Sequence, residues 1–148
     1  MGQTEVYYQY TVMYKNEDDN YYHNDTEKYS QELSVVRRLS ILQRKYKYCK
    51  IVTREISLWK DIRELCCTIT QDEVSEWKDC TVYVTIYDLL GMIKSKDLLP
   101  QKIKYKNKIW TYNEDETDYI NSDCDLFISL FNNYYIKDFI GDKVEVIR

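Results

Sequence analysis

Apolar side chains alternate with other residues near the N-terminus. They occupy every second position in one run: Val6, Tyr8, Tyr10, Val12 and Tyr14. A period of two, with aromatic and β-branched side chains, predicts a strand over residues 6–15. The polar run at residues 16–20 then predicts a turn, and residues 21–25 a short returning strand.

After residue 30 the spacing becomes helical. Apolar residues recur three and four positions apart, at Val35, Val36, Leu39, Leu42 and Tyr46. This spacing predicts an amphipathic helix, for which Ser30 is the expected N-cap. A β-branched run at residues 51–56 predicts the next strand. Residues 1–60 are therefore expected to form a strand–strand–helix–strand unit.

Residues 61–80 lack strong periodicity and are interpreted as a connector. Within it, Thr70-Gln71-Asp72-Glu73 matches the capping-box pattern and predicts a short helix. Residues 81–148 predict a second unit, with a helix that ends before Pro100, a hairpin about Lys106-Asn107 and a final strand at residues 143–147. The predicted fold class is α+β, with two small sequential units of antiparallel strands and packed helices.

The composition describes a globular chain encoded by an AT-rich genome. The 148 residues are 44% hydrophobic and 31% charged, with 16 tyrosines, three glycines and no alanine, whose codons need G and C. No segment approaches the roughly 20 apolar residues of a membrane span. The N-terminus lacks the basic and apolar regions of a secretion signal. We therefore expect a soluble protein of the bacterial cytoplasm that has no membrane partner.

The cysteines favour free thiols. They are odd in number and have no CxxC spacing: Cys49, Cys66, Cys67, Cys80 and Cys124. Zinc sites need paired thiolates or imidazoles at close spacing, and the single histidine, His23, is distant in sequence. We expect neither metal nor disulfides. A redox role for the adjacent Cys66 and Cys67 stays open, although neighbouring side chains usually point to different sides.

Motifs that carry catalysis are absent from the sequence. It contains no GxSxG elbow, phosphate loop, HExxH or glycine-rich dinucleotide turn. Three glycines leave little scope for backbone cradles around phosphates. The acidic residues at 114–118 lack the spacing and central glycine of an EF-hand. We therefore expect a protein that is not an enzyme and needs no cofactor.

Three segments of the second half carry a resemblance: TIYDLLGMIK, PQKIKYKNKIWTYNEDETDYI and FIGDKVEVI. Over residues 85–147 the chain resembles a module of small accessory proteins in prophages of low-GC Gram-positive bacteria. Gly141-Asp142-Lys143 stands where that module usually has Asn-Asp-Glu. The resemblance implies a phage setting, in which small accessory proteins often disable host defences.

Charge is segregated along the chain. Between Lys28 and Arg63, ten basic residues stand against three acidic ones, a net charge of +7, so the remainder carries −11 of the total of −4. Guanidinium forks and tyrosine rings in this segment predict an anion-binding face. Its candidate contacts are Arg37, Arg38, Arg44, Lys47 and Arg54. The alternative is a solvated helix surface balanced by acidic loops folded against it.

Two functional hypotheses follow. In the first, the protein is a stoichiometric inhibitor of a host immune effector, such as a CRISPR-Cas nuclease, and docks through an acidic, tyrosine-rich surface. The candidate contacts are Asp18, Asp19, Glu114, Asp115 and Glu116. In the second, the basic face sequesters an anionic nucleotide signal or nucleic acid. Edge strands and exposed tyrosines also favour a homodimer.

Overall fold

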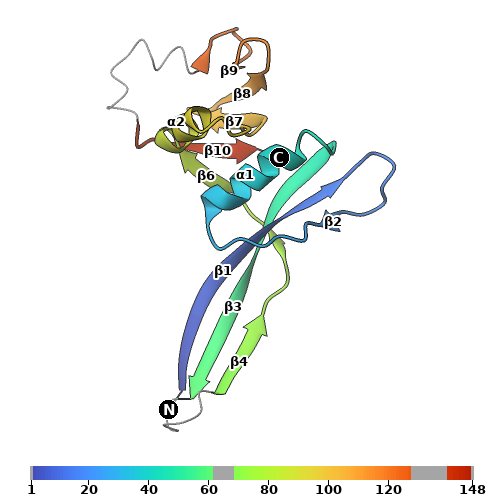
Figure 1. The fold of residues 1–148 in the computed structure, drawn as a ribbon, viewed down its shortest axis with the longest axis vertical. Coiled ribbons are helices and arrows are strands. Elements are labelled where there is room, and N and C mark those ends of the chain that lie inside the picture. The colour runs from blue at the N-terminus through green and yellow to red at the C-terminus, as the bar shows by residue number, and fades with distance from the viewer. Residues whose placement is uncertain (1, 62–68, 128–139, 148) are drawn as a thin grey trace.

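The computed structural model describes residues 2–61, 69–127 and 140–147. These residues form two antiparallel sheets and two helices, so the predicted α+β class is confirmed. The strands of the first sheet come from residues 2–79 and those of the second from residues 82–147. Figure 1 shows the first sheet as a long arm that extends below the helices, with the second sheet above the helix of residues 32–42.

The first sheet has the strand order β2-β1-β3-β4, and β5 also pairs with β3. Its strands are β1 (Gly2–Lys15), β2 (His23–Asn24), β3 (Tyr48–Asp61), β4 (Ile69–Val74) and β5 (Lys78–Asp79). The predicted first strand is confirmed, and the returning strand is shorter than residues 21–25. β3 is longer than the predicted residues 51–56 because it pairs with β1 along its whole length.

β4 lies where the sequence predicted a short helix, so that prediction is wrong. The capping-box pattern at residues 70–73 falls inside the strand, which pairs with β3 from Ile56 opposite Val74 to Asp61 opposite Ile69. A cap contributes only about 1 kcal/mol. The ladder with β3 satisfies the backbone groups along the segment and adds cross-strand contacts. This long-range pairing therefore outweighs the local signal.

The helix α1 (Glu32–Leu42) lies where the two sheets meet. It buries Val35, Val36, Leu39 and Leu42, as the spacing predicts. Its N-cap is Gln31 rather than the predicted Ser30, and the Gln31 side chain makes no capping hydrogen bond. Because α1 contacts β1, β3 and β6, it connects the first sheet to the second.

The second sheet has the strand order β6-β10-β7-β8-β9. Its elements are β6 (Val82–Thr85), α2 (Ile86–Lys94), β7 (Lys102–Tyr105), β8 (Lys108–Asn113), β9 (Asp118–Ile120) and β10 (Lys143–Ile147). The predicted hairpin is confirmed, with Lys106 and Asn107 at φ 49° and 63°, as a two-residue type I′ turn requires. The predicted helix and final strand are also confirmed. Most of the aromatic segment at 126–140 lies outside the described residues.

One cluster of buried side chains joins the two sheets and the two helices. Val12 and Leu39 belong to it from the first half of the chain, and Leu89, Ile103 and Trp110 from the second. The predicted connector supplies β4 and β5 to the first sheet, and the second sheet begins at β6. The free end of the arm lies beyond both helices (Figure 1).

Candidate functional site

Arg38, a predicted anion contact, is paired with a buried carboxylate. Its Nε donates to Asp25 Oδ2 at 2.7 Å, and its Nη2 donates to Asp25 Oδ1 at 3.1 Å. Asp25 is 4% exposed. The hydrogen bonds to Asp25 raise the pKa of Arg38 above its ordinary value. The guanidinium fork therefore holds the segment after β2 against α1 and is already occupied.

Arg44 reaches from the end of α1 to the second sheet. Its Nη1 donates to the carbonyl of Ser40 at 2.8 Å and to that of Leu99. Its Nη2 donates to Glu114 Oε1 at 3.4 Å, and its guanidinium lies 5.9 Å from the centroid of the Tyr112 ring. Arg44, a predicted anion contact, is therefore hydrogen-bonded to Glu114, a predicted acidic contact, and it links the two halves of the chain.

Arg37 and Lys47 form exposed ion pairs. Arg37 Nε lies 3.4 Å from Asp97 Oδ2, and Lys47 Nζ pairs with Glu17 Oε1. About half of each basic side chain remains accessible to water. Such pairs contribute little stability and open easily. Both residues therefore stay available to a ligand that offers a stronger anion.

Arg54 lies on β3 and is held by neutral groups. Its Nε donates to Gln9 Oε1 at 2.8 Å, and its guanidinium lies 4.2 Å from the centroid of the Trp77 ring. Every one of the five predicted cations thus has a partner within the chain. The structure distributes them along α1, the segment that follows it and β3, and does not gather them into a single anion cradle.

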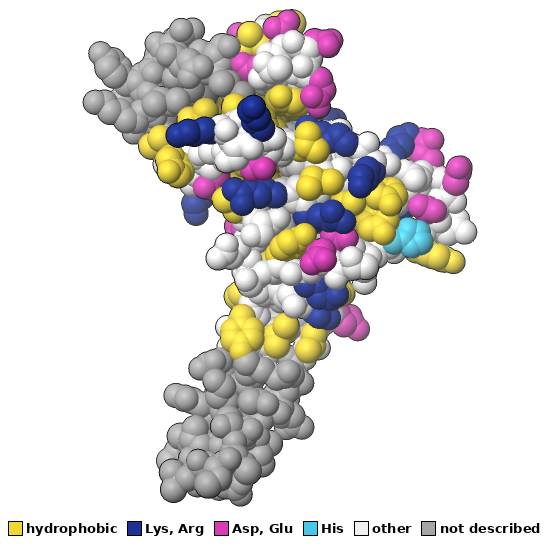
Figure 2. Space-filling model, in the orientation of Figure 1, with side chains coloured by type: hydrophobic (Ala, Val, Ile, Leu, Met, Phe, Trp, Pro, Cys, Tyr) yellow, Lys and Arg dark blue, Asp and Glu magenta, His cyan; other side chains and the backbone are white. Residues whose placement is uncertain are grey.

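The five predicted acidic contacts lie at two separate turns. Asp18 and Asp19 belong to the loop between β1 and β2, whereas Glu114, Asp115 and Glu116 belong to the β8–β9 turn. Figure 2 shows acidic side chains at the top and at the right-hand edge of the molecule, with basic and hydrophobic ones between. The acids therefore form two patches and not one continuous face.

Tyrosine rings and lysine ammonium groups meet beside the β1–β2 loop. Lys15 Nζ lies 5.1 Å from the centroid of the Tyr22 ring and 5.5 Å from that of Tyr48. Lys50 Nζ lies 4.5 Å from the Tyr22 ring, and Lys47 Nζ 5.6 Å from the Tyr48 ring. These are cation–π distances, so each ring has two cationic neighbours. We call these five residues the tyrosine–lysine cluster.

Two of the five residues of this cluster, Lys15 and Tyr22, were not predicted from the sequence. Tyr48 lies within the basic segment between Lys28 and Arg63, whereas Lys15 and Tyr22 lie outside it. The antiparallel pairing of β1 with β3 sets Lys15 opposite Tyr48, and the β1–β2 loop returns Tyr22 to the same place. The alternation of apolar residues up to Tyr14 followed by a turn was the available signal, because it predicts that residues on either side of the turn are neighbours.

The surroundings of the cluster are also aromatic. Tyr14 stacks on Tyr46 with ring centroids 4.2 Å apart and lies 5.9 Å from the His23 ring. Tyr21, in the loop, is 72% exposed. Figure 2 shows the histidine beside hydrophobic side chains at this end of the molecule. The region therefore contains both a stacked pair of aromatic rings and an exposed aromatic side chain.

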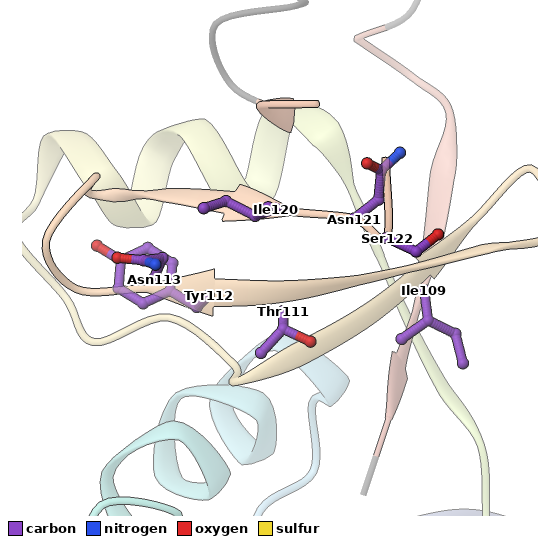
Figure 3. Close-up of a pocket in the computed structure, with 7 residues that line it drawn as sticks. All are labelled: Ile109, Thr111, Tyr112, Asn113, Ile120, Asn121 and Ser122. Atoms are coloured by element: carbon purple, nitrogen blue, oxygen red, sulfur yellow. The ribbon is translucent and has the colours of Figure 1, made fainter. Parts of the chain in front are cut away.

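The groove in Figure 3 lies on β8 and β9. It has a volume of 450 Å³ and is lined by Ile109, Thr111, Tyr112, Asn113, Ile120, Asn121 and Ser122. Figure 3 shows Ile109 and Thr111 on the same side of β8. The Asn113 and Asn121 side chains accept hydrogen bonds from backbone N–H groups of the turns that follow them. Because its lining residues carry no charge, the groove offers hydrogen bonds and apolar contact without an acid–base pair.

The titratable groups with the largest changes in pKa are buried or hydrogen-bonded within the fold. Burial raises the pKa of the Cys49 thiol to about 11, so little thiolate exists at neutral pH. Burial, and a hydrogen bond of 2.5 Å donated to Asp142 Oδ2, raise the pKa of Tyr105. Within the described residues, no group of three or more His, Cys, Asp and Glu side chains is placed to hold a metal ion. Cys66 and Cys67 lie outside the described residues.

Comparison with known proteins assigns this chain to no family: no family model, curated protein or solved structure matches it. The resemblance to prophage accessory proteins therefore stays a prediction. Among the helices of the described part of the chain, none is long and apolar enough to cross a membrane.

Proposed function

We propose that this chain is a non-enzymatic, phage-encoded anti-defence protein that binds and inhibits a host immune effector in the bacterial cytoplasm. A CRISPR-Cas nuclease is an effector of this kind. The observation that carries the proposal is the tyrosine–lysine cluster beside the acidic β1–β2 loop, in which Lys47 and Tyr48 are exposed and the other three residues are partly buried. The phage-like segments of the sequence and its lack of catalytic motifs support binding over turnover.

The cluster has the properties of a protein-docking surface. Tyrosine offers a large rigid contact area and a hydrogen-bonding tip, and it is enriched where interfaces gain most of their energy. Tyr22 and Tyr48 each have two ammonium groups within 5.6 Å of the ring centroid, and these contacts restrain the rings, so little side-chain freedom is lost on binding. Such preorganisation favours a tight complex.

The charge around the cluster suits a basic target. Four acids belong to the β1–β2 loop or pair with a lysine of the cluster: Glu17, Asp18, Asp19 and Asp79. Two of the lysines are paired with acids of this set, Lys47 with Glu17 and Lys50 with Asp79, the latter at 2.9 Å. The cleft of a nucleic-acid-binding effector is rich in Lys and Arg. An acidic loop with accessible tyrosines complements such a cleft.

Phage plating on bacteria with active CRISPR immunity tests the proposal. Expression of the chain is expected to restore plaques, and native mass spectrometry is expected to find a complex of fixed stoichiometry with the nuclease. Tyr48→Ala should weaken binding about 30-fold, the effect of losing an interface residue worth about 2 kcal/mol. Tyr83→Ala is the matched control, because Tyr83 is an exposed tyrosine on β6, away from the cluster.

Three results would count against the proposal. Full phage resistance despite expression contradicts the anti-defence role. Equal losses for Tyr48→Ala and Tyr83→Ala contradict the choice of surface. If the double variant Asp115→Lys with Glu116→Lys abolishes binding while Asp18→Lys does not, the β8–β9 turn is the docking site instead.

The same cluster supports a second candidate function, capture of an anionic nucleotide signal or nucleic acid. Three ammonium groups beside two rings suit phosphates and stacked bases. Lys15→Glu should abolish anion binding, whereas docking to a basic protein should weaken only in part, because each ring keeps one ammonium neighbour, Lys50 or Lys47. Arg38 and Arg44 are unsuitable for this test, because each holds other parts of the fold together. Arg37 and Lys47 are suitable, because their ion pairs are exposed. A nucleotide carried through purification and seen by native mass spectrometry would favour this second function.

A further inference from the structure

The outer edge of β1 is open over its first half. In the first sheet β2 pairs with β1 at Met13 and Tyr14, and Tyr29 makes a bridge to Tyr10. Among the described residues, no strand pairs with this edge at residues 2–9. The edge strands of the second sheet are only four residues (β6) and three residues (β9) long. The other edge of the first sheet, β4, is six residues long, so the β1 edge is the longest open edge of the described residues.

The hydrogen bonds show which backbone groups face outward. The Tyr10 N–H donates to the Tyr29 carbonyl at 2.7 Å, and the Tyr29 N–H donates back at 2.8 Å. The Asp25 N–H donates to the Val12 carbonyl at 2.9 Å, also on the outer side. Orientation alternates along a strand, so the N–H and C=O groups of Val6 and Tyr8 also point away from β3. Those of Tyr7 and Gln9 point toward β3.

The apolar face of β1 continues past the core. Val6, Tyr8 and Val12 lie on the same side of the strand because side chains alternate. Val12 is fully buried in the core, whereas Val6 is 51% exposed and Tyr8 52% exposed. Tyr7, on the opposite side, is exposed as well. Residues 6–8 thus combine unpaired backbone groups with accessible apolar side chains.

The edge also lacks the usual protection against pairing. Natural edge strands are blunted by lysine, proline, bulges or short length. Residues 2–9 contain neither lysine nor proline, and Glu5 is their one charged residue.

We propose that a second copy of this chain pairs antiparallel with the β1 edge. A strand edge related to its copy by a two-fold axis is self-complementary, because outward donors and acceptors match in equal number. The two arms then form one continuous sheet of order β4-β3-β1-β1-β3-β4. Figure 1 shows that this part of β1 lies beyond both helices, so a second arm can approach it with the two bodies at opposite ends.

Light scattering and amide hydrogen exchange test this dimer. The wild-type mass is expected to double with concentration, and the outward amides of Val6 and Tyr8 to become protected as it does. The inward amides of Tyr7 and Gln9 should be protected at every concentration. Val6→Pro removes an outward N–H donor that β3 does not use, so the variant should still fold. It should stay monomeric at a protein concentration about tenfold above that at which half of the wild type is dimeric. Val6→Ala keeps the N–H and should still dimerise.

The mass and the amide exchange of the wild type and its variants decide the proposal. Val6→Lys adds a charge to the edge and should also give a monomer, which covers the case in which Val6→Pro does not fold. A wild-type protein that stays monomeric with exchanging outward amides overturns the dimer, as does a Val6→Pro variant that dimerises normally. If these amides gain protection only when the nuclease is added, the edge pairs with the target and the dimer is wrong. Loss of anti-defence activity leaves the dimer proposal standing, because the mass is measured on the protein alone.

Discussion

Replacing Arg38 with methionine is expected to destabilise the fold strongly, because it leaves the buried carboxylate of Asp25 without its cationic partner. The wild-type Asp25 accepts two hydrogen bonds from Arg38 and one from the Thr26 N–H at 3.0 Å, in a site where Asp25 is 4% exposed. In Arg38→Met only the neutral Thr26 donor of these three remains. Removing one partner of a buried pair costs about 3–5 kcal/mol.

We expect the lower end of this range, about 3 kcal/mol, because the pair is not completely enclosed. The Arg38 side chain is 29% exposed, so some water reaches the site. In a chain of this length each kcal/mol shifts Tm by roughly 2–4 °C, which predicts a decrease of about 6–12 °C. The reciprocal variant, Asp25→Asn, should cost less, about 1–2 kcal/mol, since water can solvate the remaining guanidinium.

Urea unfolding followed by far-UV circular dichroism measures both costs. Arg37→Met is the matched control, because Arg37 lies on the same helix and its pair with Asp97 is exposed, at 48% and 36% of the two side chains. It should change the free energy of unfolding by less than about 1 kcal/mol. Similar costs for Arg38→Met and Arg37→Met would refute the argument, and Arg38 would then be free to act as a ligand contact.

Three further predictions concern local features. Thr85→Ala removes the hydroxyl that accepts from the Asp88 N–H and should cost about 1 kcal/mol in urea unfolding, whereas Thr81→Ala, on an exposed residue, should be near neutral. Burial raises the pKa of six tyrosines, so the unfolded chain ionises first above about pH 10. The free energy of unfolding should be constant below that pH and fall above it, and Tyr105→Phe should reduce this fall. Tyrosinate absorbance and unfolding midpoints measure both effects, and an unchanged fall in Tyr105→Phe contradicts the prediction. In mass spectrometry of thiol labelling at neutral pH, the exposed Cys124 should react quickly and the buried Cys49 slowly, while all five thiols should react after denaturation without reductant. A disulfide in the denatured, unreduced protein would contradict the last of these.

Short-range patterns were sufficient for much of the fold. The alternation before Lys15 and the helical spacing after residue 30 were confirmed, because each depends on side chains a few positions apart meeting one apolar surface. The Lys106-Asn107 turn was confirmed for a similar reason, since its two residues adopt the left-handed conformation themselves. β4 was missed because its conformation depends on β3, a partner that a local pattern does not describe.

The candidate site shows the same division more clearly. The residue order establishes that basic and acidic residues are segregated, that the chain is α+β in pattern and that its aromatic content is high. It does not establish which charged side chains are paired within the fold and which are free to bind a ligand. Arg38 finds Asp25 at a separation of 13 residues, and Arg44 finds Glu114 at a separation of 70. Likewise, Lys15 joins Tyr48 only across the β1–β3 ladder. Electrostatic and cation–π energies depend on distance in space, and that distance exists only after the strands have paired and the helices have packed.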